Sequence, residues 1–372
     1  MTYKRDSCVI CDGKIEHLLS FRNFPIYMGV ETDNTKQTPV EDMRWSACIR
    51  CGCVQLAELI ESSVLYATPH NPAIGSSWLR HHTELSQLIS ETLIKGEILE
   101  IGGANLQLAN QICRKNEEIK YTVLDYSCGK YDAASVASNI TQLNFPFEEY
   151  ESSKKYDAVV HSHMLEHAYD PLNFLEKIKN SLKPTAKMIF SVPNIAEQIK
   201  SNHTNALNFE HTYYLDEEYL SMLLWKSGFK IEKVYTFSRY NNFYVCSSTA
   251  PKNLKHTNTQ LAAKLLINFA ETLEKDVESL NRRLAQRRVY VFGAHIFTQY
   301  LLASGLKEER IIAVLDNDCA KIGKYLAGTG LKVLSPSELR DKSAPSVILR
   351  ASQFNSEIRK QLKDINRKVE LL

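Results

Sequence analysis

The sequence predicts an α/β protein with a mostly parallel central sheet and helices on both of its faces. Apolar runs with the length of buried strands recur between residues 97 and 250, at 98–101, 120–124, 156–161 and 187–192. Helical segments lie between them, and one begins clearly at Asp170-Pro171, where an N-cap residue precedes a proline. Strands and helices that alternate in this way form layered α/β domains.

A chain of 372 residues is too long for one compact core, and its pattern divides it into four segments. We expect a cysteine-bearing module, a main α/β domain, a connecting helix and a second α/β unit at residues 1–66, 67–250, 251–288 and 289–372. The first segment lacks helical periodicity and contains short apolar runs that suggest a few small strands.

Several elements of the later segments have a clear local pattern. A helix over about 76–95 has apolar residues near helical spacing, at Leu79, Leu85, Leu88, Ile89 and Leu93. The helix that starts at Asp170 is expected to end at Lys183-Pro184. In the second α/β unit we expect strands at 289–292, 311–315 and 347–349, a turn at Gly293-Ala294, and helices near 296–302, after Pro336 and at the basic C-terminal end.

The composition is that of an ordinary globular protein, with 44% hydrophobic and 24% charged residues. A formal net charge of +2 gives no electrostatic reason to expect nucleic acid or an anionic membrane as a partner. The polar start of the chain contains no apolar signal segment, and no stretch has the length of a membrane span. We therefore expect a cytoplasmic protein.

The cysteines are unevenly distributed, because five of the nine lie within the first 53 residues. Cys8-x-x-Cys11 and Cys48-x-x-Cys51 have the spacing of two metal-binding knuckles, and four thiolates suit a tetrahedral zinc ion. Four thiolates leave no open position for water, so the predicted zinc is structural. Cys53 is a fifth candidate, and four unrelated core thiols are the alternative.

A nucleotide-type cofactor site is predicted where the first strand of the main domain ends. Glu100 is followed by Gly102, Gly103 and Asn105, and glycines at such a place let the backbone approach a ligand closely. Asp125 closes the next strand, where a carboxylate can accept both hydroxyls of a ribose. These residues alone are also compatible with a dinucleotide site.

The segments that follow shift this balance. The run from Tyr156 to His167, with Asp170-Pro171 and Ser191-Val-Pro-Asn194 after it, resembles the class I S-adenosylmethionine-dependent methyltransferases. The resemblance implies that the strand end at Glu100 and its loop hold the methionine part of the cofactor and that Asp125 holds the ribose. It also implies that Asn144 borders the adenine and that His161 and Ser77 line the pocket.

The whole chain resembles the sugar C-methyltransferases that act on nucleotide-linked deoxysugars. The stretches that carry this resemblance are Cys48–Leu56, Gly75-Ser-Ser with Arg80-His81, Val291-Phe-Gly-Ala294, and the segment from Asp316 to Thr329. The resemblance implies an N-terminal zinc module, a class I methyltransferase domain and a C-terminal Rossmann-like domain. In that family a Glu-His pair supplies the general base, and Glu210-His211 matches it, with His167 as a further catalytic candidate.

The proposed chemistry suits an imidazole, since carbon methylation requires loss of the proton beside a ketone. Glu210 is expected to orient the His211 ring or to shift its pKa. The chain departs from the family at Asn208 and at His70–Ile74, where relatives have tyrosines. Methylation of a sugar hydroxyl in a polysaccharide precursor is therefore an alternative. RNA methylation and cofactor binding without turnover are further alternatives, and the sequence fits a monomer or a homodimer equally well.

Overall fold

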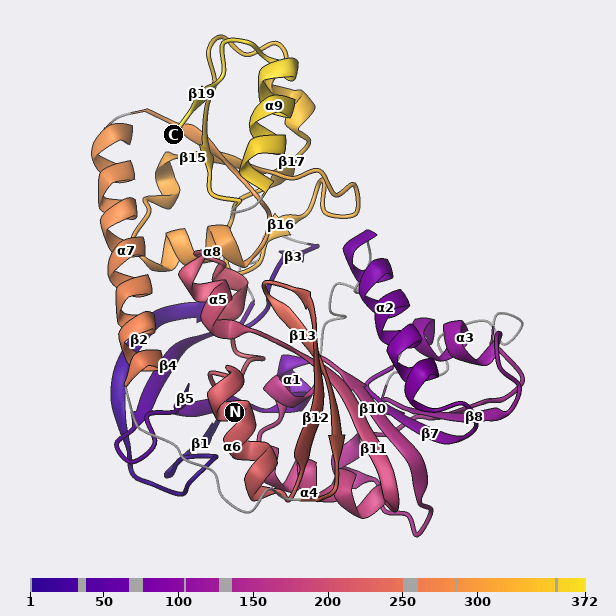
Figure 1. Cartoon of the computed structure of the whole chain (residues 1–372). Helices are drawn as coiled ribbons and strands as arrows, with labels where there is room; N and C mark the ends of the chain where they lie inside the picture. The colour runs from indigo at the N-terminus through magenta and orange to yellow at the C-terminus, as the bar shows by residue number, and fades with distance from the viewer. Residues whose placement is uncertain are drawn as a thin grey trace.

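The computed structural model arranges three regions around a large central sheet (Figure 1). The N-terminal strands lie on one side, helix α7 (Leu261–Leu284) runs along the molecule, and the C-terminal strands and helices lie at its far end. The residues that the structure describes are 2–32, 38–66, 76–103, 105–126, 136–249, 260–285, 287–351 and 354–372. The segment His70–Ile74, with Gly75 and Ala104, lies outside them.

The central sheet has seven strands in the order β12-β13-β11-β10-β7-β8-β9. Its strands are β7 (Gly96–Ile101), β8 (Ile119–Leu124), β9 (Ile140–Leu143), β10 (Tyr156–Ser162), β11 (Leu182–Pro193), β12 (Lys230–Ser238) and β13 (Asn241–Ser247). Only β13 pairs antiparallel with its neighbours, and every other pair is parallel. The chain runs outward from β7 to β9 and then returns to β10, so a topological switch point lies between β7 and β10. Ligands bind at the carboxyl ends of strands at such a point.

The predicted α/β class with a mainly parallel sheet is confirmed. The expected end of the Asp170 helix is wrong, because α4 (Pro171–Ser181) stops at Ser181 and β11 already includes Pro184. The N-cap is as expected, since the Asp170 side chain accepts a hydrogen bond from Asn173 N. The β12–β13 hairpin escaped prediction because most of β12 is exposed and lacks an apolar run.

Helix α2 (Ser76–Thr92) precedes the sheet and packs against α3 (Gln107–Cys113). Leu85, Leu88 and Ile89 are buried as the periodicity predicted, but Leu79 is 52% exposed. The buried face continues instead through His81 and His82, one turn before Leu85, so polar residues take the place of the apolar stripe there. Two further helices lie after the fifth strand, α5 (Ile195–Lys200) and α6 (Glu217–Lys226).

The N-terminal module is a three-stranded antiparallel sheet of β2 (Ile15–Pro25), β4 (Val40–Cys48) and β5 (Val54–Leu56). Its first two strands are longer than the small strands predicted, and they bury Met43 and Trp45. Shorter elements surround it, namely β1 (Thr2–Lys4), β3 (Val30–Glu31), β6 (Glu58–Ile60) and α1 (Ser62–Leu65).

The C-terminal region contains a parallel sheet in the order β17-β15-β14-β18-β19. Its elements are β14 (Val289–Phe292), α8 (Ile296–Ala303), β15 (Ile311–Leu315), β16 (Tyr325–Leu326), β17 (Val333–Leu334), β18 (Ser346–Leu349), α9 (Asn355–Ile365) and β19 (Glu370–Leu371). The helix expected after Pro336 is only a four-residue 3-10 turn. Within the described residues, no helix combines the length and apolar character needed to cross a membrane.

Candidate functional site

The turn after β7 leaves no room for side chains. Gly102 has a φ of +82°, and a Cβ there would collide with the side chain of Met164. A Cβ on Gly103 would lie 2.5 Å from the Glu100 carboxyl carbon. The positive φ favours glycine at Gly102, and a side chain at Gly103 would displace the Glu100 carboxyl group, so the backbone of this turn is bare at the switch point.

Glu100 ends β7 as an almost fully buried carboxyl group, 4% exposed. Burial raises its pKa to about 8, although the nearby Tyr121 hydroxyl works in the opposite direction. Its Oε2 atom has no hydrogen-bond partner among the described residues. A buried carboxyl oxygen without a donor is costly, so this group suits a site that a polar ligand completes.

The other predicted cofactor residues lie around the same edge of the sheet. Asp125 follows β8 and is partly buried, and Asn144 follows β9 and is exposed. Asn105 accepts a hydrogen bond from Gln107 N at 3.1 Å and so stabilises the start of α3. Ser77 is exposed in the first turn of α2. The edge thus brings together three strand ends and the beginnings of two helices.

His161 is separate from this group. It is fully buried in β10, where its ring stacks on Phe190 with centroids 4.8 Å apart and meets Phe174 edge-on. Burial lowers its pKa to about 3. The ring is therefore a neutral part of the core.

Aromatic and histidine rings cover the edge from the side of α2. Trp78 lies against the rings of His81 and His163, at centroid distances of 5.3 and 5.1 Å. His81 also packs on Phe243, and burial lowers its pKa to about 2. His82 Nδ1 lies 2.7 Å from Gln107 Oε1, which joins α2 to α3.

A second cluster contains the predicted catalytic residues. His167 ends the short 3-10 helix Leu165–His167, and Glu210 and His211 precede α6. The Glu210 carboxylate lies 3.8 Å from His167 Nδ1, and the rings of His167 and His211 are 5.2 Å apart. His211 Nδ1 donates a hydrogen bond to Ala206 O at 2.8 Å. Its Nε2 therefore carries the free lone pair of a neutral ring.

Glu166 belongs to the same cluster, although its sequence pattern did not single it out. Its side chain is fully buried, and one carboxylate oxygen accepts a hydrogen bond from His163 Nδ1 at 2.9 Å. One ligand atom each of Glu166, His167 and His211 lies within 4.8 Å of the other two. A glutamate between Leu165 and His167 gives no sequence sign of burial, because the turn that encloses it is set by contacts with distant residues.

Arg5 is another functional candidate that sequence reasoning missed. Its guanidinium donates to Thr212 O at 2.6 Å and to Tyr169 O at 2.8 Å. These carbonyls follow His211 and His167 closely in the chain. Strand β5 adds backbone bonds to the same segment, from Leu56 N to Thr212 O and from Tyr214 N to Val54 O. The N-terminal module thus holds both histidine-bearing loops in place.

The four predicted zinc ligands come together as expected from their spacing. Cys8 and Cys51 have their sulfurs 3.6 Å apart, and Cys11 and Cys48 have theirs 3.5 Å apart. All four are buried, and their sulfurs lie within 4.8 Å of one another. A tetrahedral zinc with bonds of about 2.3 Å needs sulfur separations of roughly 3.8 Å. The donor set therefore fits zinc, while Cys53 lies outside the group.

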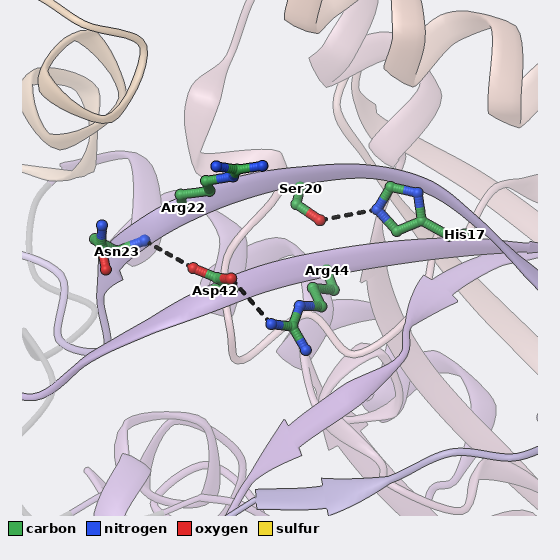
Figure 2. Close-up of a pocket in the computed structure, with 6 residues that line it drawn as sticks. All are labelled: His17, Ser20, Arg22, Asn23, Asp42 and Arg44. Atoms are coloured by element: carbon green, nitrogen blue, oxygen red, sulfur yellow. Dashed lines mark hydrogen bonds and ion pairs between the residues drawn. The ribbon is translucent and has the colours of Figure 1, made fainter.

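A separate pocket of about 530 Å³ lies along the paired strands β2 and β4 (Figure 2). Arg44 bonds to Asp42 there, and His17 Nε2 lies 2.9 Å from Ser20 Oγ. The pocket is lined by His17, Ser20, Arg22, Asn23, Asp42 and Arg44. None of these belongs to the predicted cofactor or catalytic residues.

Two family models match the chain. Residues 78–234 match a methyltransferase domain, and residues 261–370 match a C-methyltransferase C-terminal domain. The first match covers most of α2 and the strands from β7 to β11, where the switch point and the glycine turn lie. Both matched regions belong to methyltransferases, so the chain contains a methyltransferase domain and is a methyltransferase enzyme. None of the proteins with curated functions matches this methyltransferase significantly.

Solved methyltransferase structures resemble part of the enzyme at low identity. A 1,6-didemethyltoxoflavin-N1-methyltransferase from Burkholderia thailandensis is 13% identical over 45% of this chain and 78% of its own, with a TM-score of 0.38. A methyltransferase from Aquifex aeolicus is 16% identical over 46% of this chain and 93% of its own, with a TM-score of 0.37. N,N-8-amino-8-demethyl-D-riboflavin dimethyltransferase from Streptomyces davawensis is 16% identical over 45% of this chain and 55% of its own, with a TM-score of 0.39.

Proposed function

We propose that this methyltransferase transfers the methyl group of S-adenosylmethionine to a carbon atom of a nucleotide-linked ketosugar. The observation that carries the proposal is the match of residues 261–370 to the C-terminal domain of C-methyltransferases. This region packs on the segment that leads into Glu210 and His211, because Tyr300 of α8 donates a hydrogen bond to Leu207 O at 2.8 Å.

The cofactor is assigned to the carboxyl ends of β7, β8 and β9. We place its amino-acid part at Glu100, Gly102, Gly103 and Asn105. The bare glycine turn and the unpartnered oxygen of Glu100 support this assignment. The sulfonium of the bound cofactor supplies an electrophilic methyl group.

The remaining cofactor contacts follow the strand ends outward. Asp125, after β8, is assigned to the ribose hydroxyls, and Asn144, after β9, to the base. Ser77, exposed in the first turn of α2, is assigned to the same pocket. His161, which the resemblance assigned to the same pocket, is a core residue and is left out of the proposed binding set.

His211 is proposed as the group that takes the proton from the carbon beside the ketone. Its Nδ1–H is held by Ala206 O, so Nε2 is the proton acceptor. Burial and the neighbouring His167 lower the pKa of His211, which keeps the ring neutral and ready to act as a base. His167 and Glu210 form a second pair beside it and are proposed to hold the acceptor.

The C-terminal domain is proposed to cover the sugar nucleotide. His295 is the N-cap residue of α8. Burial and the charge of Lys321 lower the pKa of His295 to about 4, and Asp316 and Glu210 work in the opposite direction. The contact between Phe24 and Phe209 joins the N-terminal module to the same place.

The domain boundaries are proposed at the segments already described, 1–66, 67–250, 251–288 and 289–372. Zinc held by Cys8, Cys11, Cys48 and Cys51 is proposed to stabilise the first of them. The cysteine site lies at one end of β4 and just before β5, the strand that bonds to Thr212 and Tyr214.

Methylation of a sugar hydroxyl is the second candidate, and Asn208 favours it. This residue replaces a tyrosine of the C-methyltransferase family, and its side chain is only 2% exposed. Asn208 Oδ1 accepts hydrogen bonds from the backbone N–H groups of Glu210 and His211, so it shapes their loop and does not reach an acceptor. A hydroxyl acceptor needs no side chain to polarise a ketone.

The test is a methyl-transfer assay with ¹³C-methyl-labelled cofactor and a panel of nucleotide-linked 4-ketosugars and their reduced alcohols. We expect product only with the ketosugars, with the label in a carbon-bound methyl group by NMR. Label in methoxy groups would support the hydroxyl alternative. Absence of transfer to every sugar nucleotide, with tight binding of S-adenosylhomocysteine retained, would contradict both.

A further inference from the structure

We infer that Glu166, and not the neighbouring Glu210, is the anion that allows His211 to accept a proton. The inference rests on the proposed function for the role of His211 as the base. Sequence adjacency points to Glu210, but that carboxylate lies 3.8 Å from His167 Nδ1. Glu166 instead shares one cluster with both histidines, with one ligand atom of each of the three residues within 4.8 Å of the other two.

Glu166 is fixed in its position on two sides. Its Oε1 accepts a hydrogen bond from His163 Nδ1 at 2.9 Å, and its backbone carbonyl accepts one from Thr212 N at 3.1 Å. The second bond joins the Glu166 turn directly to the residue after His211. The Glu166 Oε2 atom has no hydrogen-bond partner among the described residues. One oxygen therefore anchors the carboxylate, and the other is free within the cluster.

His163 anchors Glu166 without neutralising it. Asn241 Nδ2 lies 2.6 Å from His163 Nε2 and donates to it, so the ring proton is on Nδ1, where it is given to Glu166. A neutral ring that donates one hydrogen bond leaves the full negative charge on the carboxylate. That charge is then available to the two remaining histidines of the cluster.

Because the cluster is buried, the negative charge of Glu166 has a large effect on the proton affinity of His211. Burial disfavours a protonated imidazole and, together with His167, lowers the pKa of His211. The charge of Glu166 raises that pKa, and the charge of Glu210 does so to a smaller extent. Burial raises the pKa of Glu166, but the hydrogen bond from His163 lowers it and the three nearby histidines favour the anion, so the pKa is about 2. The carboxylate is therefore ionised at neutral pH, and the charge that forms on His211 during proton transfer lies beside it.

The other titratable groups around the cluster cannot replace Glu166. His161 stays neutral because burial lowers its pKa to about 3, and Tyr213 stays neutral because burial raises its pKa well above the usual value. His167 competes for the same anion, but it has Glu210 as a partner of its own. We therefore assign the charge of Glu210 to His167 and that of Glu166 to His211.

The test is an NMR titration of histidine-labelled enzyme without any methyl acceptor, in the wild type and in Glu166→Gln and Glu210→Gln. Resonances of His211 are assigned by their loss in His211→Gln. We expect Glu166→Gln to lower the proton affinity of His211 at least about tenfold, which is one pKa unit. Glu210→Gln should alter His167 more than His211, and Glu166→Asp, which keeps the charge, should restore most of the His211 affinity.

The inference is overturned if Glu166→Gln leaves the His211 titration unchanged, or if Glu210→Gln lowers it more. A second divalent ion per chain that Glu166→Gln removes would also overturn it, because a bound cation would cancel the charge. If Glu166→Gln does not fold, the histidine titration of the wild-type enzyme provides the test. His211 should then titrate well above His81, a buried histidine whose pKa no carboxylate raises; equal behaviour of the two contradicts the inference.

Failure of the proposed function would be separate from these results. Lack of methyl transfer to every sugar nucleotide would remove the proposed acceptor and leave the pairing of Glu166 with His211 intact. Conversely, an unchanged His211 titration with normal methyl transfer would remove Glu166 from the mechanism only.

Discussion

At the scale of single residues, the site contains two buried carboxyl groups with opposite behaviour. Burial raises the pKa of Glu100 to about 8, whereas hydrogen bonding and nearby histidines hold that of Glu166 at about 2. The difference follows from their partners, because Glu166 accepts a hydrogen bond from His163 and lies near two further histidines, whereas only the Tyr121 hydroxyl opposes the effect of burial on Glu100. One residue is thus suited to receive a ligand and the other to supply a fixed charge.

Glu100 leads to a prediction about stability and pH. Its folded-state pKa lies above that of an unfolded glutamate, so the folded protein keeps a proton that the unfolded chain has lost between about pH 4.5 and pH 8. Its contribution to stability therefore falls as the pH rises through this window. We expect Glu100→Gln to reduce the loss of thermal stability between pH 5 and pH 8.5 in cofactor-free enzyme.

The matched control for this prediction is Glu91→Gln, an exposed position on α2. Each unit of pKa difference corresponds to at most about 1.4 kcal/mol, so the thermal midpoint should separate the two variants clearly at the higher pH. A decline in Glu100→Gln as steep as that of the wild type would show that Glu100 is not held protonated.

At the scale of elements, the sequence predicted those strands and sites that depend on contacts between residues close together in the chain. The bounds of β14 and β15 match the predicted runs because each is a short apolar segment between turns. The exposed strand β12 had no such pattern, since its pairing with β13 supplies the order. The cysteine spacing likewise predicted four converging thiols, whereas the burial of Glu166 and the contacts of Arg5 depend on residues distant in the chain.

The cysteine site gives the prediction for the N-terminal element. Cys48→Ser should remove one equivalent of zinc per chain and destabilise the sheet of β2, β4 and β5 by several kcal/mol, because metal binding contributes directly to folding. Cys53→Ser is the control, since Cys53 is equally buried but lies outside the group of four. Zinc content and the thermal midpoint measure both effects. Loss of zinc in both variants would show that Cys53 is a ligand.

At the scale of the whole molecule, the three regions meet around Glu210 and His211. Arg5 of the N-terminal module bonds to the loops after His167 and His211, and Tyr300 of the C-terminal region bonds to Leu207. The central sheet supplies the glycine turn and the strand ends. Catalytic geometry is therefore set by contacts between regions, which no single segment of the sequence reveals.

Arg5→Met should weaken this arrangement without affecting the cofactor. Loss of hydrogen bonds from a charged donor costs about 1.5–3 kcal/mol, so we expect methyl transfer to fall at least about tenfold while S-adenosylhomocysteine binds as before. Hydrogen exchange should become faster at residues 167–169 and 212–214. The control is Lys4→Met, at an exposed neighbouring position, which should change neither the rate of methyl transfer nor hydrogen exchange. Slower methyl transfer in both variants would point to a general loss of stability.

The central claim is that His211 removes the proton from the carbon that receives the methyl group. Its most direct measurement is proton exchange at the carbon beside the ketone of a nucleotide-linked 4-ketosugar, incubated with enzyme in heavy water and followed by NMR. The account predicts exchange with the wild type and a loss of at least about 100-fold in His211→Gln, which keeps S-adenosylhomocysteine binding. Exchange at the wild-type rate in His211→Gln, or methyl transfer to that carbon by the variant, would contradict it.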